Sequence, residues 1–128
     1  FNIFNLVDTA LKGDLGYTYK ILTGLRAEGV EPGALIWALS REIRQLAAMK
    51  LLIETGQSTQ QAMRQYRVWN NRQQITGSAL KRSSSNQLNN LIQKLALADQ
   101  MMKGMAPGNT WDQLEQISLS LAGAKLPC

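Results

Sequence analysis

The side chains best suited to chemistry in this chain are the cations of one central segment. Residues 55–98 contain no Asp or Glu, yet they hold six basic side chains: Arg64, Arg67, Arg72, Lys81, Arg82 and Lys94. The whole chain carries a net charge of +5 from 14 basic and 9 acidic residues, so everything outside this segment sums to −1. Excess charge confined to one segment indicates a local acidic partner rather than a uniformly basic surface.

Aromatic side chains are interleaved with these cations. Tyr66 and Trp69 stand among Arg64, Arg67 and Arg72. Guanidinium groups pair with phosphates and aromatic rings stack on bases, so this pattern is typical of nucleic-acid binding. A solvated basic helix face beside a core Trp explains the same pattern, and the sequence leaves both interpretations open. The candidate DNA-facing residues are Arg64, Arg67, Trp69, Arg72, Lys81 and Arg82.

The residues that enzymes use most often are absent or scattered. The chain has no His, and its one Cys is the last residue, Cys128. This excludes a His general base, a Cys/His metal cluster and a His-activated nucleophile. The acidic pairs Glu28/Glu31 and Asp112/Glu115 stand near expected helix ends, which favours helix-dipole or solvent roles. No phosphate-cradling GxxxxGK[ST] or GxGxxG run occurs, so we expect no catalytic activity, metal or cofactor.

Size and composition fit one folded domain. The chain has 128 residues, of which 45% are hydrophobic and 18% charged. A single terminal Cys allows no internal disulfide, which favours a reducing, cytoplasmic location. The longest apolar run, residues 34–39, is far shorter than the ~20 residues of a membrane helix. Because the chain starts without Met inside an apolar helical pattern, we expect residues 1–128 to be one domain of a longer polypeptide.

Helical periodicity extends over almost the whole chain, and no segment alternates as a strand does. The strongest helix begins at Pro32, which suits a first turn, and stops near Gly56. Its apolar side chains form one wide stripe: Leu35, Leu39, Ile43, Leu46, Met49 and Ile53. A stripe of this width contacts more than one neighbouring helix.

Two shorter helices are expected before this one and four after it. Gly13 ends the first helix, and Asp14 caps the second, whose core face is expected to carry Leu15, Tyr19, Leu22 and Leu25. Ser58 opens a short helix with a capping box, and a turn near Arg67 leads into a helix over residues 69–80. The serines 83–85 cap a long helix, and a second capping box at residues 110–113 opens the last one. The pattern predicts an all-α, antiparallel bundle-like domain of about six to seven helices.

Several stretches, taken in order, resemble the C-terminal domain of the bacterial DNA polymerase III delta subunit, a component of the sliding-clamp loader. They are residues 4–13, 21–32 (ILTGLRAEGVEP), 39–42, 67–72 (RVWNNR), 99–104 and 111–115. The ordered set over the whole chain carries the resemblance, because no single motif is specific. It implies a helical collar domain of a five-membered ring.

The resemblance also implies a role in DNA replication. The family's delta subunit belongs to the DNA-directed DNA polymerase III holoenzyme and does not hydrolyse ATP. It lies beside gamma or tau, with delta prime across a gap, and it binds the beta clamp through an N-terminal domain that this chain lacks. This domain is therefore expected to assemble with gamma/tau and delta prime, and to contact primed DNA weakly at most. Trp69 matches an aromatic that the family places near DNA, with a core position as the alternative.

A collar domain must present apolar surface to its neighbours. The candidate subunit-interface residues lie off the main stripe of the longest helix: Ile36, Trp37, Leu51 and Leu52. Otherwise Trp37 and Trp111 are expected in the core, and Phe4, Tyr17 and Tyr19 in the core or an interface. A stand-alone helical nucleic-acid-binding module using residues 64–82 is the alternative function, and a small helical enzyme is the third.

Overall fold

The computed structural model describes residues 1–125, and every regular element in that range is a helix. Residues 126–128, including Pro127 and Cys128, lie outside the described residues. The elements are α1 (Ile3–Lys12), α2 (Leu15–Ala27), α3 (Pro32–Glu54), α4 (Thr59–Gln65), the 3-10 helix η1 (Asn70–Arg72), α5 (Gln73–Arg82), α6 (Ser85–Met102) and α7 (Thr110–Leu121). The predicted all-α fold is confirmed, with seven α-helices among the described residues.

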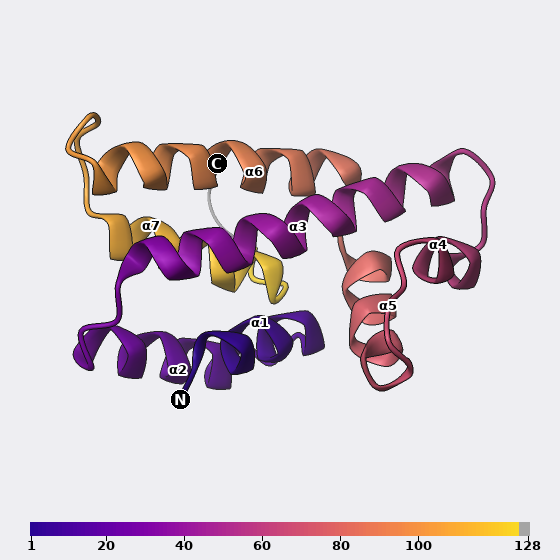
Figure 1. Cartoon of the computed structure of the whole chain (residues 1–128), viewed down its shortest axis with the longest axis horizontal. Helices are drawn as coiled ribbons and strands as arrows, with labels where there is room; N and C mark the ends of the chain where they lie inside the picture. The colour runs from indigo at the N-terminus through magenta and orange to yellow at the C-terminus, as the bar shows by residue number, and fades with distance from the viewer. Residues whose placement is uncertain (126–128) are drawn as a thin grey trace.

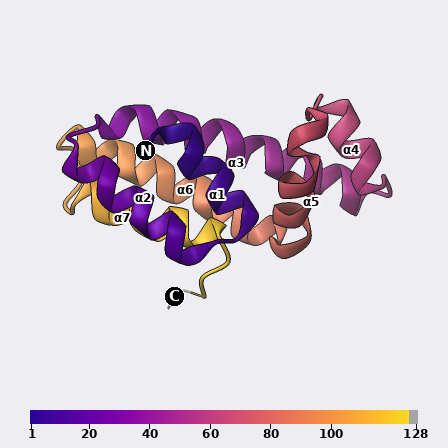
Figure 2. The ribbon, with the colours of Figure 1, turned by 90° about the horizontal axis from the view of Figure 1, so that it is seen from below.

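The 23-residue helix α3 is the axis of the molecule. Helix α6 runs along it in the opposite direction, while α1 and α2 lie on the other side of α3 and α7 contacts all four (Figure 1). Helices α4 and α5 form a separate group at one end of α3, as a second view also shows (Figure 2). Helix α5 of this group contacts both α1 and α3, so these three helices face one another.

The apolar stripe of α3 forms the centre of the core. Leu35, Leu39, Ile43 and Leu46 have no exposed surface, and Met49 is 1% exposed. They belong to one continuous cluster with buried side chains of α1, α2, α5, α6 and α7. Burying a side chain of this size stabilises the fold by roughly 2 kcal/mol, so these five residues of the predicted stripe contribute substantially to stability. Among residues 1–125, no helix has the length and apolarity needed to cross a bilayer.

Most helix ends follow the local signals in the sequence. Gly13 adopts the left-handed conformation, with φ of 85°, directly after α1. The side chain of Asp14 accepts a hydrogen bond from the first turn of α2. At α4, Ser58 and Gln61 exchange the two hydrogen bonds of a capping box, at 3.0 and 2.9 Å. These predictions are confirmed. Each depends on residues only a few positions apart, so the local sequence is enough to make it.

Two predictions about helix position are wrong. Helix α2 buries Thr18 and Ile21 together with Leu22 and Leu25, while Leu15 and Tyr19, both expected on the core face, are 41% and 51% exposed. The buried face of the helix is therefore rotated relative to the expected one. Thr18 can be buried because its hydroxyl donates a hydrogen bond to the Asp14 carbonyl at 2.6 Å. The segment expected to be one helix over residues 69–80 begins as η1 and becomes α-helical only at Gln73.

The cap of α7 also differs from the prediction. Asn109, one residue before the predicted capping box, is the N-cap, and its Oδ1 accepts from the Asp112 amide at 3.1 Å. The same oxygen accepts from Arg26 Nη2 at 3.4 Å, and Arg26 Nη1 pairs with Asp112 at 3.0 Å. Asn109 therefore caps α7 and also accepts a hydrogen bond from Arg26 of α2. It occupies the N-cap position that the local sequence assigned to Thr110.

The aromatic residues differ from expectation as well. Trp37 is 60% exposed, so the expectation of a core position is wrong, and Phe4, at 71%, is also on the surface. On α3, Trp37 shares its face with the exposed Arg41 and Arg44, at i+4 and i+7, rather than with the buried stripe. Trp111 is half-buried and packs against the core, close to its prediction.

Candidate nucleic-acid interface

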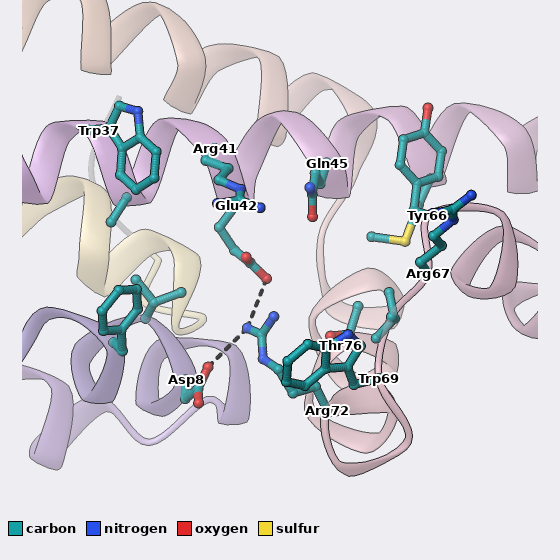
Figure 3. A pocket seen from close by; sticks show the side chains of 15 residues that line it. Asp8, Trp37, Arg41, Glu42, Gln45, Tyr66, Arg67, Trp69, Arg72 and Thr76 are labelled. Carbon is teal, nitrogen blue, oxygen red and sulfur yellow. Dashed lines mark hydrogen bonds and ion pairs between the residues drawn. The ribbon is translucent and has the colours of Figure 1, made fainter.

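An open groove of about 610 Å³ lies where α1, α3 and the segment from α4 to α5 face one another (Figure 3). Helix α3 contributes Trp37, Arg41, Glu42 and Gln45 along one side. Residues 66–69 and Arg72 line the opposite side, and Phe4 and Asp8 of α1 complete it. The groove thus brings together residues more than 60 positions apart in the sequence.

The backbone at Arg67 explains how Trp69 reaches this groove. Arg67 has φ of 55° and is the only non-glycine residue with positive φ among residues 1–125. Its left-handed turn closes α4, with the Val68 amide donating to the Met63 carbonyl at 3.0 Å. Val68 then packs against the core, which leaves Trp69 in an extended conformation with 73% of its surface exposed. The turn predicted near Arg67 is confirmed.

Arg72 forms an ion-pair bridge across the groove. Its Nη2 donates to Asp8 Oδ1 at 2.9 Å and to Glu42 Oε1 at 3.2 Å (Figure 3). Partial burial alone would lower the pKa of the Arg72 guanidinium, but the two carboxylates outweigh this and raise its pKa above the ordinary value. Arg72 therefore pairs with two acidic side chains and joins α1 to α3, so its charge is used within the fold.

Arg82, also a candidate DNA-facing residue, is engaged within the fold. Its Nη2 donates to the carbonyls of Ala10, Leu11 and Leu121 at 3.2, 3.1 and 3.0 Å. These carbonyls belong to the last turns of α1 and α7, where intrahelical donors run out; the Ala10 carbonyl also accepts from the Gly13 amide at 3.0 Å. The burial that this requires lowers the pKa of the Arg82 guanidinium.

The other candidate DNA-facing residues are divided between two places. Arg67 and Trp69 line the groove, and Arg64 is exposed on the adjoining helix α4. Lys81 is also exposed, but it lines a different, shallow depression beside the N-terminus of α6. The acid-free segment therefore does not form a single basic face.

Within the groove, Arg41 and Arg67 are the cations that make no ion pair with other described residues. The guanidinium of Arg41 lies 5.7 Å from the centre of the Trp37 ring, a cation–π arrangement. Sequence reasoning missed Arg41 as a site residue. Its i, i+4 spacing from Trp37 was the available signal, because such pairs share one helix face.

The candidate interface residues also occupy different environments. Ile36 is 8% exposed and belongs to the core cluster, so its expected surface position is wrong. Leu51 is 60% exposed near the C-terminal end of α3, and Leu52 is half-buried against the core. No group of three or more metal-ligating side chains occurs in the part of the chain that the structure describes.

The fold and the groove define a class of protein, an all-α helical domain with an open groove at one end. Residues 3–128 match the family described as "Processivity clamp loader gamma complex DNA pol III C-term", and the chain belongs to this family. The resemblance proposed from the ordered motifs is confirmed.

Named relatives agree with this membership. The DNA polymerase III subunit delta of Escherichia coli K12 is 35% identical over 125 residues, covering 94% of this chain and 35% of that protein. The subunit delta of Haemophilus influenzae is 27% identical over 129 residues, covering 94% and 38%. A solved Bacillus subtilis DNA clamp loader delta protein shares the fold, with a TM-score of 0.67 and 22% identity over 94% of this chain and 35% of that one. The chain thus spans little more than a third of these relatives.

Proposed function

We propose that this domain is a non-catalytic assembly domain of a delta-type clamp-loader subunit in DNA replication, docking onto gamma/tau and delta prime. The observation that carries the proposal is the family match over residues 3–128, supported by 35% identity to a protein named DNA polymerase III subunit delta. A polypeptide with this role belongs to the polymerase III holoenzyme in the cytoplasm, and its beta-clamp contact lies outside this domain.

Leu51 is the residue we propose at the centre of a subunit contact. It is 60% exposed on α3, the helix that organises the core, so it presents apolar surface from a rigid element. Half-buried Leu52 adjoins it. A standard interface buries about 800 Å² per partner, and a few large apolar side chains carry most of its energy.

Co-elution of this chain with gamma/tau and delta prime in size-exclusion chromatography tests the proposal. The unchanged chain is expected in the complex, and Leu51→Asp is expected to weaken its incorporation. Leu15→Asp is the matched control, because Leu15 is an exposed leucine on a different helix, α2. If the unchanged chain elutes alone, the assembly role is contradicted; if both variants are incorporated equally well, Leu51 is not a contact.

We further propose that the side of the molecule formed by Arg64, Arg67 and Trp69 contacts primed DNA weakly. Support comes from the exposure of Trp69 and from the unpaired guanidinium of Arg67 beside it. With so few cations, affinity is expected to be weak and to fall as salt rises. Binding tighter than about micromolar at physiological salt would instead favour the alternative, a stand-alone nucleic-acid-binding module, because non-specific binding is typically 10⁻⁴–10⁻⁶ M.

A further inference from the structure

Two exposed tryptophans line the same groove. Trp37, 60% exposed, extends from α3, and Trp69, 73% exposed, extends from the link between α4 and η1 (Figure 3). Burying a side chain of this size normally stabilises a protein by about 2–3 kcal/mol. Leaving two indoles in solvent in one groove, on elements that the fold itself brings together, indicates a partner that covers ring faces.

The charges around these rings define the chemistry of that partner. Arg41 lies against Trp37, and Arg67 is two residues from Trp69, so each indole has an unpaired guanidinium nearby. The two carboxylates of the groove, Asp8 and Glu42, are both bound to Arg72. Three arginines against two carboxylates leave the groove with a net charge of +1, and both carboxylates are ion-paired with Arg72. Alternating rings and cations complement a ligand that alternates bases and phosphates.

A buried polar atom at the groove gives a second indication. Thr76 of α5 lines the groove and is 1% exposed, yet its Oγ1 has no hydrogen-bond partner in residues 1–125. A buried, unpaired hydroxyl costs free energy unless a ligand or water supplies a partner. Gln45, on the facing helix, adds an amide that can donate and accept. Base edges carry donors and acceptors that complement the Gln45 amide, whereas the buried Thr76 hydroxyl becomes accessible only if the groove opens around a ligand.

We propose that this groove binds an unpaired DNA strand. Trp37 is a second base-stacking residue in addition to Trp69, and Arg41 and Arg67 are the phosphate partners. The inference rests on the proposed DNA contact and goes beyond it by naming the substrate class. In a duplex the base faces are stacked on one another, so indole rings that meet a ligand with their faces select unpaired bases. Trp37 is thereby assigned to DNA rather than to a subunit interface.

Single-tryptophan variants of this chain test the inference, since the chain contains three Trp residues. Each of Trp37, Trp69 and Trp111 is retained in turn while the other two are changed to Phe. Each variant is titrated at low salt with an oligo(dT) strand and with a blunt duplex of the same length. Stacking is expected to quench the fluorescence of Trp37 and of Trp69 with oligo(dT). Trp111, half-buried outside the groove, is expected to remain unquenched, and the duplex to quench far less.

Affinity provides an independent readout. Trp37→Ala is expected to weaken oligo(dT) binding about tenfold, within the range for losing one stacked base. Leu15→Ala is the control, because Leu15 is an exposed apolar side chain that does not line the groove. Circular dichroism is expected to be unchanged in both variants, since neither side chain is buried.

The outcomes separate this inference from the broader proposal. Quenching of Trp69 without Trp37 would preserve the DNA contact and overturn the second stacking site. Quenching of neither would overturn both. Equal quenching by blunt duplex would overturn the selection of unpaired bases. A Trp37 spectrum that responds to the gamma/tau collar domain and not to oligo(dT) would assign this indole to a protein interface and overturn the inference.

Discussion

At the scale of single residues, Arg82 acts as a shared cap for two helices. Its Nη2 donates to carbonyls of both α1 and α7, and Gly13 and Gly123 leave space for the side chain, since a Cβ there would lie 2.9 and 3.0 Å from its atoms. A hydrogen bond from a charged donor to a helix-end carbonyl is worth more than one from a neutral donor. This arginine therefore contributes to folding rather than to binding.

Arg82→Ala is expected to lower the free energy of unfolding by about 2–3 kcal/mol, because the part-buried carbonyls of Leu11 and Leu121 lose their charged donor and that of Ala10 keeps only the Gly13 amide. Urea denaturation measures the change. Lys81→Ala is the control, since Lys81 is the exposed neighbour and such surface changes stay within about 0.5 kcal/mol. Equal effects of the two variants would show that the Arg82 contacts contribute little.

Arg67 combines an exposed charge with a backbone conformation that favours glycine. Its φ of 55° costs an L-residue about 1–2 kcal/mol, whereas glycine adopts it freely. Arg67→Gly is therefore expected to leave the unfolding free energy unchanged or raise it by up to about 1 kcal/mol. At the same time it removes one of the two unpaired cations of the groove.

DNA binding measured on the same variant completes this prediction. Affinity for oligo(dT) at low salt is expected to fall several-fold while thermal stability is retained. Arg44→Ala is the control for lost charge, because Arg44 is exposed on α3 and lies outside the groove. Alanine is used there because glycine inside a helix would destabilise it. Unchanged affinity in Arg67→Gly would remove Arg67 from the candidate interface.

At the scale of elements, the two possible caps of α7 can be distinguished by substitution. Asn109→Ala is expected to cost about 1 kcal/mol or more, because Asn109 caps α7 and also accepts from Arg26. Thr110→Ala is expected to change stability by less than about 0.5 kcal/mol. Urea denaturation of both variants gives the comparison. A larger loss in Thr110→Ala would restore the capping box that local sequence indicates.

Helices and their ends were largely predictable because their signals are local. Gly13, Asp14 and Ser58 each act on residues within four positions, and each does what its neighbours in sequence indicate. The rotation of α2 was not predictable from apolar spacing, because Thr18 is buried only once its hydroxyl finds the carbonyl four residues earlier. The apolar spacing predicts Tyr19 on the core face, whereas in the fold its side chain, which ends in a polar hydroxyl, lies at the surface.

The site was predictable only in part, for a related reason. The RVWNNR motif and the exposed cations near it were visible in the sequence, and the fold places Arg67 and Trp69 together in the groove. Arg72 has the same local setting, yet its partners lie 64 and 30 residues away, on α1 and α3. Nothing near Arg72 in sequence indicates those carboxylates. Pairing over such distances decides which cations remain free, so it separates binding residues from structural ones.

At the scale of the whole molecule, the excess charge is distributed over more than one surface. Arg64 and Arg67 lie near the groove, whereas Lys81 and Lys94 do not line it, and Arg82 is occupied by α1 and α7. Non-specific attraction would use all exposed cations alike, while a defined strand path uses only those along it. The salt dependence of binding distinguishes the two cases.

Three phosphate contacts, by Arg41, Arg67 and Arg64, give an expected slope of log affinity against log salt of about −2 on single strands. Changing both Arg41 and Arg67 to Gln is expected to make this slope shallower by about 1.4, whereas changing both Lys81 and Lys94 to Gln removes the same charge and is expected to leave it unchanged. Fluorescence titrations with oligo(dT) at four salt concentrations measure it. If both double variants make the slope shallower by the same amount, all the exposed cations attract DNA alike. The groove is then not the path of the strand.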